Sequence, residues 1–272
     1  MVFLGDSITH AGHFVAMVDA HFRSQSSGRA FECINIGLPS ETACGLSEPD
    51  HPFPRPNVHE RLDRALERTK PDIVVACYGM NDGIYYPFSN ERFATYRKGI
   101  ETLIDKVQAS GARLVLMTPG PFDPLPLRKK GKLLPKTAKK FAWFGIYENY
   151  DKEVIARYSK WILGLRGRVE MVVDLRTPIL KHVTEKRKEN ADYALSNDGV
   201  HVDKRGHRLI ADALLRSWGE TPVKPDAEIF KKAEQREVLL RYAWISHVEH
   251  LRPGVKKGLP LEEALKRAKE LE

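Results

Sequence analysis

The sequence has little cysteine, and it lacks any apolar run long enough to cross a membrane. Its three cysteines, Cys33, Cys44 and Cys77, are an odd number in a chain of 272 residues. A disulfide scaffold needs several pairs in a short chain, so the sequence excludes that class of protein. A membrane-spanning helix needs about 20 consecutive apolar residues, and no stretch approaches this length, so we expect no membrane span.

Acidic residues are fewer than basic ones, but the basic excess is local. The chain has 44 Lys and Arg against 36 Asp and Glu, a net charge of +8 with a pI near 9.3. The densest basic run is RKKGKLLPKTAKK at 128–140, which fits either a solvated loop or a contact with a polyanion such as an acidic polysaccharide. Zinc-finger spacing, RNP-like aromatic motifs and basic heptads are missing, so we expect no nucleic-acid partner.

The length and composition predict a globular protein with a sizeable core. Hydrophobic residues make up 42% of the chain, and its length fits one large domain, with or without an appendage. The chain opens directly in a strand and shows no signal peptide, so an upstream segment could have been removed. Secreted and cytoplasmic locations therefore both stay open.

Short apolar runs alternate with helical patterns through the first 218 residues. The predicted strands span residues 2–4, 31–36, 72–78, 112–119 and 169–175. The predicted helices span residues 13–24, 57–70, 91–110, 147–165 and 204–218. Strands that alternate with helices indicate right-handed crossovers, and hence a parallel sheet with helices on both faces.

The pattern changes after Trp218. Residues 219–226 are predicted to be a proline-bearing linker, and 227–272 show helical patterns with no further strand. We therefore expect a main domain at 1–218 and a linker with a helical C-terminal extension at 219–272. The extension either packs on the core or pairs with another subunit, so a homo-oligomer formed through it is one hypothesis.

Glycine and polar residues follow the predicted strands. Ser7 comes after the first strand, Gly37 after the second and Asn81 after the third. DGVH at 198–201 lies beyond the last strand. Ligands of open α/β sheets bind at the carboxyl ends of the strands, so we expect these residues to share one site.

This set contains the groups that ester hydrolysis requires. Ser7 at a strand–helix turn would present its hydroxyl as the nucleophile. His201 can accept the proton, and Asp198 can hold the other imidazole nitrogen. The backbone N–H groups of Ser7 and Gly37 and the side-chain amide of Asn81 are candidate oxyanion donors.

Four motifs occur in order along the chain: GDSIT, NIGLPSET, YGMNDG and DGVH. With them the sequence resembles the Ser-Gly-Asn-His hydrolases, also called GDSL esterases, over residues 2–218. The resemblance implies a flavodoxin-like three-layer α/β/α sandwich with a parallel sheet, here followed by the helical extension. It also implies a catalytic domain without metal or cofactor, in which the family's roles fall to Ser7, Gly37, Asn81 and His201, with Asp198 as the triad acid.

One position departs from the family pattern, because the second motif often carries another glycine near position 40, where this chain has Ser40. Each motif also has a simpler explanation when taken alone. A helix cap would explain Ser7, and turn chemistry would explain Gly37 or Asn81. All four motifs together favour the catalytic interpretation.

Three further residues are candidates for the substrate pocket. His10 lies one helical turn after Ser7, and Tyr85 and Tyr86 follow the YGMNDG motif. His10 either lines the mouth or sits on a solvated helix start. The tyrosines either form a wall for an acyl group or a sugar, or pack beneath the loop.

The resemblance predicts a serine esterase with a Ser-His-Asp triad. Many members of the family are sugar deacetylases, which favours a short acyl ester, and in particular a carbohydrate O-acetyl group, as the substrate. A lipase, lysophospholipase or thioesterase of the same family is the alternative among enzymes. A non-catalytic binding protein that keeps the hydrolase fold is the alternative from another class.

Overall fold

A five-stranded parallel sheet lies at the centre of the computed structural model, which describes residues 1–25 and 31–271. The strands are β1 (Val2–Gly5), β2 (Ile34–Asn35), β3 (Ile73–Cys77), β4 (Arg113–Met117) and β7 (Met171–Val173). Their order in the sheet is β2-β1-β3-β4-β7, with every neighbouring pair parallel. This is the flavodoxin-like order of a doubly wound sheet, and it confirms the predicted fold class.

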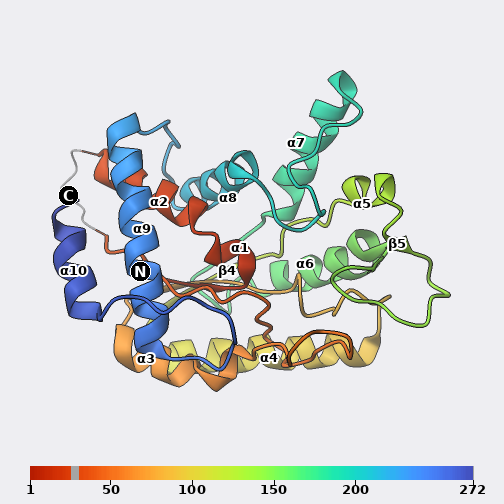
Figure 1. Cartoon of the computed structure of the whole chain (residues 1–272), viewed down its shortest axis with the longest axis horizontal. Helices are drawn as coiled ribbons and strands as arrows, with labels where there is room; N and C mark the ends of the chain where they lie inside the picture. The colour runs from red at the N-terminus through yellow and green to blue at the C-terminus, as the bar shows by residue number, and fades with distance from the viewer. Residues whose placement is uncertain (26–30, 272) are drawn as a thin grey trace.

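Helices cover both faces of the sheet (Figure 1). One face carries α2 (His13–Arg23), α7 (Arg176–Glu189) and α8 (Lys204–Ser217). The other face carries α3 (Leu62–Thr69), α4 (Asn90–Ala109) and α6 (Ala156–Leu163). Successive strand residues point to opposite faces: Phe3 packs with the first group of helices and Leu4 with the second. Because both faces are covered, the strands consist mostly of apolar residues, which is why the sequence revealed them.

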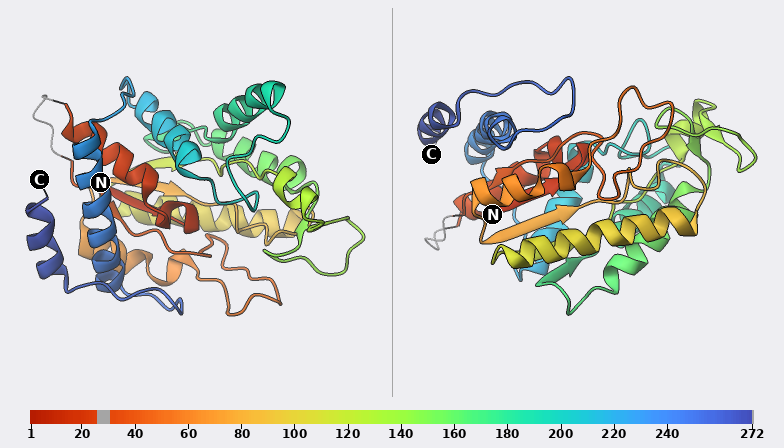
Figure 2. Two further views of the ribbon diagram at one scale, coloured as in Figure 1. Left: turned by 45° about the horizontal axis from the view of Figure 1, so that its top comes forward. Right: turned by 90° about the horizontal axis from the view of Figure 1, so that it is seen from below.

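The C-terminal extension consists of α9 (Ala227–Val248) and α10 (Leu261–Lys269), joined by a loop. Helix α9 packs against α2 and against the edge strand β2, and α10 packs against α9. Buried Leu240, Trp244 and Val248 of α9 belong to the same apolar cluster as the α3–α4 face of the sheet. The extension therefore lies against the sheet domain, as the two views in Figure 2 show.

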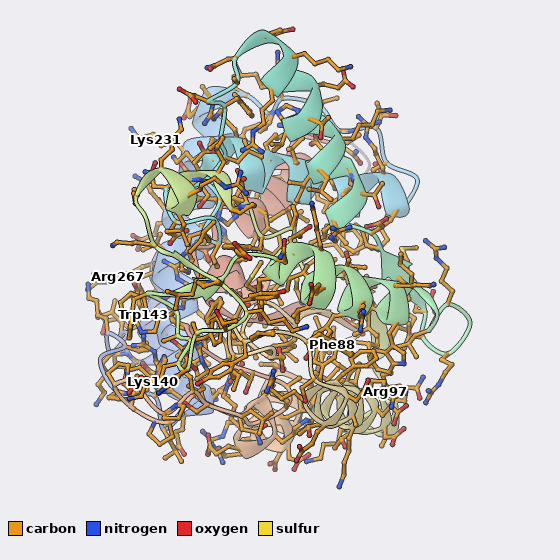
Figure 3. All side chains as sticks on the ribbon, turned by 90° about the vertical axis from the view of Figure 1, so that its right-hand side faces the viewer. Phe88, Arg97, Lys140, Trp143, Lys231 and Arg267 are labelled. Carbon is orange, nitrogen blue, oxygen red and sulfur yellow. The ribbon has the colours of Figure 1, made fainter. Side chains whose placement is uncertain are left out.

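The basic run lies in an excursion between β4 and α6, which holds α5 (Leu125–Lys129), β5 (Leu133–Leu134) and β6 (Ile146–Tyr147). Lys140 and Trp143 project from its outer side (Figure 3). Lys130 Nζ donates to the carbonyl of Asn197 at 2.6 Å, so the excursion reaches the loop that carries the DGVH motif. No helix in the described ranges is both long and apolar enough to cross a membrane.

Candidate active site

Ser7 is the first residue of the short helix α1 (Ser7–His10), directly after β1. The turn is tight, because a Cβ on Gly5 would lie only 2.2 Å from Oγ1 of Thr9. Asp6 caps the helix by accepting the Ile8 N–H at 2.9 Å. Burial raises the pKa of Asp6 to about 6. The carboxylate next to Ser7 is therefore a buried cap, and it stabilises the turn that presents the serine.

Ser7, His201 and Asp198 form a continuous chain of hydrogen bonds. Ser7 Oγ lies 2.7 Å from Nε2 of His201, and Nδ1 of His201 lies 2.6 Å from Oδ2 of Asp198. An ionised carboxylate only accepts, so Nδ1 carries the proton and Nε2 is free to accept from the serine. The structure thus brings together all three residues that the sequence predicted as nucleophile, base and acid.

The loop around Asp198 holds the carboxylate by its own backbone. Oδ1 of Asp198 accepts the N–H groups of Val200 at 2.9 Å and His201 at 2.8 Å, and the hydroxyl of Ser196 at 2.8 Å. Burial alone would raise the pKa of Asp198, but the hydrogen bonds and charge of His201 lower it well below its usual range. Asp198 is therefore ionised at neutral pH and can stabilise a protonated His201.

The pKa of His201 moves in the opposite direction. Burial lowers it, but the hydrogen bond and negative charge of Asp198, together with the charge of Asp6, outweigh burial and raise it above the usual value. An upward shift of the pKa makes the imidazole a stronger base, so the geometry and the electrostatics of His201 both suit general-base catalysis.

The segment after β2 corrects one sequence prediction. The N–H of Gly37, predicted to be an oxyanion donor, already donates to Oδ1 of Asn35 at 2.9 Å. Glycine is still required at this position, because a Cβ would lie 2.6 Å from the backbone nitrogen of His10. Gly37 therefore lets the segment approach α1 closely, and its N–H is not available to a ligand.

Ser40 supplies the free donor in this segment instead. The N–H of Leu38 donates to the carbonyl of Gly5 at 2.8 Å, and the N–H of Glu41 donates to the carbonyl of Leu38 at 3.1 Å. Pro39 has no N–H. The Ser40 N–H has no acceptor among the described residues, so it is open to a ligand. Ser40 has a φ of 68°, in the left-handed region that favours glycine. The glycine that the family often carries near position 40 was the sequence signal for this role.

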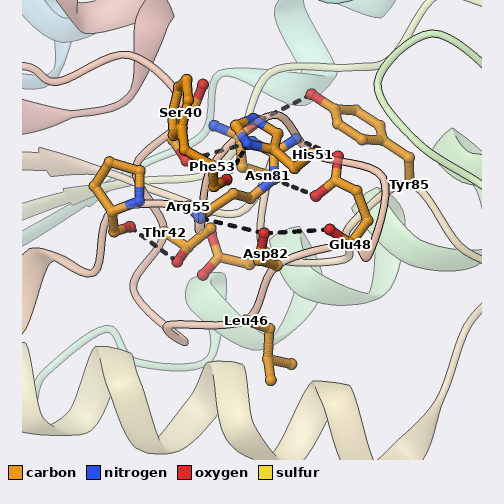
Figure 4. Close-up of polar contacts among 12 residues, drawn as sticks. Ser40, Thr42, Leu46, Glu48, His51, Phe53, Arg55, Asn81, Asp82 and Tyr85 are labelled. Atoms are coloured by element: carbon orange, nitrogen blue, oxygen red, sulfur yellow. Dashed lines mark hydrogen bonds and ion pairs between the residues drawn. The ribbon is translucent and has the colours of Figure 1, made fainter. Parts of the chain in front are cut away.

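Asn81 has a fixed amide in the turn after β3. Its Oδ1 accepts the hydroxyl of Tyr85 at 2.8 Å (Figure 4). Its Nδ2 donates to the carbonyl of Glu41 at 3.2 Å. These contacts set the orientation of the amide and leave the second N–H of Nδ2 without an acceptor in the described part of the chain. The Asn81 amide is bonded to the carbonyl of the residue that follows Ser40, so the turns that carry the two donors are in direct contact.

Tyr85 orients Asn81 rather than lining an open pocket, because its side chain is only 3% exposed. His10 and Tyr86, the other two residues predicted to line the substrate pocket, also contact other parts of the protein. His10 Nδ1 donates to the carbonyl of Gly37 at 2.9 Å, and burial lowers its pKa to about 4, so the ring is neutral. The ring of Tyr86 packs on Phe141 with centroids 5.0 Å apart.

A buried ion pair supports the turn that carries Ser40, and sequence reasoning missed it. Arg55 donates to both carboxylate oxygens of Glu48, at 2.5 and 2.7 Å, and both side chains are almost fully buried (Figure 4). Arg55 also donates to the Ser40 carbonyl at 3.3 Å, and its guanidinium lies over the ring of Tyr85, 5.4 Å from the centroid. The pair thus connects Ser40 with the tyrosine that orients Asn81.

Metal ligands are not grouped in the described ranges, where no three His, Cys, Asp or Glu side chains are placed to hold an ion together. The Ser7 hydroxyl is bonded to a histidine and, through it, to a carboxylate. The N–H donors of Ser40 and Asn81 lie in the turns that follow β2 and β3, the two strands on either side of β1. Their arrangement can activate a hydroxyl and stabilise an oxyanion, which is the chemistry of acyl transfer.

A comparison with protein-family models finds a match over residues 3–209 to the GDSL-like Lipase/Acylhydrolase family. The chain belongs to this family. As a member of the GDSL-like family it is a carboxylic ester hydrolase, and the resemblance seen in the four sequence motifs is confirmed. No curated protein matches the sequence.

Solved structures with the same fold include several esterases. Axe2, an acetylxylan esterase from Geobacillus stearothermophilus, is 20% identical with a TM-score of 0.57, over 82% of this chain and 95% of that one. The acetyl xylan esterase AlAXEase is 22% identical with a TM-score of 0.58, over 79% of this chain and 97% of that one. BT4096, a gut microbial diltiazem-metabolizing enzyme, is 20% identical with a TM-score of 0.59, over 80% of this chain. The GDSL-like chain spans only 46% of BT4096.

Proposed function

We propose that the protein is a serine esterase that removes short acyl groups, and acetyl groups in particular, from carbohydrate esters. One observation carries this proposal. The hydroxyl of Ser7 is hydrogen-bonded to His201, which is hydrogen-bonded to Asp198, at 2.7 and 2.6 Å. This connectivity is what a nucleophile, a general base and an orienting acid require.

In the first step, Ser7 Oγ attacks the carbonyl carbon of the ester while His201 Nε2 accepts the hydroxyl proton. Asp198 stabilises the imidazolium that forms. The oxyanion of the tetrahedral intermediate accepts hydrogen bonds from the N–H of Ser7, the N–H of Ser40 and the amide of Asn81. Each such donor contributes about 2.7–4 kcal/mol in the transition state. His201 then gives its proton to the departing alcohol oxygen, and the acyl group stays on Ser7.

In the second step, water hydrolyses the acyl-serine. His201 takes a proton from the water as its oxygen attacks the acyl carbon, and the same three donors hold the second oxyanion. The C–O bond to Ser7 breaks, the serine oxygen recovers the proton from His201, and the carboxylic acid leaves. Every proton in this cycle passes through Nε2 of His201.

A carbohydrate ester is supported by the structural neighbours and by exposed aromatic side chains on the excursion between β4 and α6. Axe2 and AlAXEase are described as acetyl xylan esterases. The catalytic mutants of Axe2 replace a serine, an aspartate and a histidine, the last two being three positions apart, as Asp198 and His201 are. Trp143 and Phe144 on the excursion are 54% and 52% exposed, and exposed aromatic rings are suitable faces for sugar rings.

An acyl-chain series tests the proposal and separates it from a lipase or thioesterase. We expect hydrolysis of p-nitrophenyl acetate to be faster than that of the butyrate and octanoate, and we expect acetate release from acetylated xylooligosaccharides. Rates that rise from acetate to octanoate would reject the deacetylase assignment. Ser7→Ala and His201→Ala should abolish turnover while the thermal midpoint is kept, and turnover retained in both variants would reject the triad.

A further inference from the structure

Arg252, in the loop between α9 and α10, reaches the turn that carries Ser40. Its Nε donates to the carbonyl oxygen of Pro39 at 3.1 Å, although 213 positions separate the two residues. Its guanidinium lies over the ring of Phe53, 5.0 Å from the centroid, and its Nη1 donates to the carbonyl of Pro253 at 2.7 Å. These three contacts fix the direction of the guanidinium toward Pro39.

The carbonyl of Pro39 and the N–H of Ser40 belong to the same peptide group. This peptide is trans, as are all peptide bonds in the described ranges, so the C=O and the N–H point in opposite directions. A donor that holds the oxygen therefore also sets the direction of the N–H. A cation at the oxygen draws electron density from the amide, and this makes the N–H a stronger donor.

The neighbouring carbonyls of this turn are each held by a donor. The side chain of His10 donates to the carbonyl of Gly37, and that of Arg55 donates to the carbonyl of Ser40. The side-chain amide of Asn81 donates to the carbonyl of Glu41. The positive φ of Ser40 makes this turn costly for a residue with a side chain, so its geometry depends on such contacts. Arg252 supplies the contact at the peptide that ends in the free N–H.

The charge of Arg252 is not shared with an acid. In residues 1–25 and 31–271 no carboxylate lies within ion-pair distance of its guanidinium, whereas Arg55 and Arg61 on the same side of the sheet each pair with a glutamate. A cation next to a carboxylate would have its field at the peptide largely cancelled. Within these ranges, no paired carboxylate therefore cancels the field of Arg252 at the Pro39–Ser40 peptide.

Helix α9 anchors the extension that carries this arginine. Glu237 Oε1 accepts from Nδ2 of Asn35 at 2.7 Å, and Asn35 is the residue that holds the Gly37 N–H. Arg241 pairs with Glu237 at 3.4 Å and donates to the carbonyl of His10. Both side chains of α9 are buried. The extension is therefore attached to β2, which leads into the Ser40 turn, and to α1, which begins at Ser7.

We propose that Arg252 is a positioning residue for ester hydrolysis, and that it orients and polarises the Pro39–Ser40 peptide so that the Ser40 N–H donates to the oxyanion. The C-terminal extension thereby completes the oxyanion pocket of the sheet domain. This inference rests on the proposed esterase function. It assigns a part in catalysis to residues beyond 209, where the match to the family ends.

Steady-state kinetics of Arg252→Met and Arg252→Lys on p-nitrophenyl acetate test the proposal. Loss of an oxyanion donor lowers kcat by about 10²–10³-fold, and the Ser40 N–H remains in these variants, so we expect kcat of Arg252→Met to fall about tenfold with KM within twofold. Arg252→Lys keeps the charge and should recover part of kcat. The matched control is Lys256→Met. It removes another cation of the same loop, whose ammonium group lies over the ring of Tyr242.

Two further readouts separate positioning from a general loss of structure. In the pH profile of kcat/KM, the acid-side midpoint of Arg252→Met should equal that of the wild type, because the triad is intact. Phosphonylation of Ser7 by a fluorophosphonate should slow in this variant along with kcat. If the wild type is active and Arg252→Met keeps the wild-type kcat, this inference alone is overturned. The same holds if Lys256→Met loses as much kcat as Arg252→Met. A wild type that hydrolyses no ester would overturn the proposed function and this inference together.

Discussion

The Oγ atom of Ser7 lies 2.7 Å from Nε2 of His201, although the two residues are 194 positions apart in the chain. Ser7 follows the carboxyl end of β1, and His201 stands in the loop between α7 and α8. The parallel sheet brings both segments to one edge, so the distance follows from the topology.

The pH dependence of activity reports the pKa of His201. Burial lowers this pKa, but Asp198 raises it above 6.5. His201 acts as a base only when neutral, so kcat/KM should be full at alkaline pH and fall as the pH drops through a midpoint above 6.5. Asp198→Asn should move the midpoint down and lower kcat by about 10⁴-fold. A wild-type midpoint well below 6.5, or an unmoved midpoint in Asp198→Asn, would contradict this assignment.

The hydroxyl of Tyr85 fixes the orientation of the Asn81 amide, which we propose as an oxyanion donor. Tyr85→Phe removes the donor to Oδ1, so the amide can rotate and present its oxygen to the oxyanion. We expect kcat to fall by about tenfold, less than the 10²–10³-fold cost of losing a donor outright. Tyr86→Phe is the control, because it removes the next hydroxyl along the chain. Equal kcat values for the two variants in steady-state assays would argue against this role.

The positive φ of Ser40 makes a prediction about stability. Ser40→Gly removes the cost of about 1–2 kcal/mol that a side chain incurs in the left-handed region, and it keeps the N–H. We expect the free energy of unfolding to rise by about 1 kcal/mol, with kcat nearly unchanged. Ser40→Val should lower both quantities, because a β-branched residue fits this region poorly. Urea unfolding in which Ser40→Gly is less stable than the wild type would show that the turn does not favour glycine.

The buried ion pair of Arg61 and Glu41 stabilises the segment that contains Ser40. Arg61 donates to both carboxylate oxygens at 2.7 Å, and Tyr78 donates to the same carboxylate at 2.6 Å. Arg61→Met leaves Glu41 charged and buried, so we expect a loss of about 3–5 kcal/mol in the free energy of unfolding.

Arg64→Met is the control for that prediction. Arg64 pairs with Glu60 at the surface, with both side chains about one third exposed, and such pairs contribute only about 0–1 kcal/mol. Similar losses in the free energy of unfolding for Arg61→Met and Arg64→Met, measured by chemical denaturation, would show that the buried pair stabilises the fold no more than the surface pair does.

The regular part of the fold could be predicted from the sequence because its strands are buried on both faces. Continuous apolar runs marked β1, β3, β4 and β7. The prediction for 31–36 was too long, since only Ile34–Asn35 pair as a strand. Helix α7 was missed: only Ile179 and Val183 of its side chains are buried, and Pro178 stands in its first turn. A mostly exposed helix shows no clear apolar periodicity, so its sequence resembles a loop.

The candidate site could be predicted as far as its side chains are concerned. The motifs contained Ser7, Asn81, Asp198 and His201, and the structure brings these residues to one edge of the sheet. The choice between the N–H groups of Gly37 and Ser40 depends on which carbonyl or amide oxygen already accepts each one, and a residue pattern does not contain this information. The contact of Arg252 with Pro39 likewise depends on how the extension packs.

Mass spectrometry after treatment with a fluorophosphonate shows directly whether Ser7 is the nucleophile. We expect one adduct per chain, located on Ser7, with much slower labelling in His201→Ala because the base is lost. A wild-type protein that stays unlabelled, or an adduct on a different serine, would contradict the assignment of Ser7 as the nucleophile.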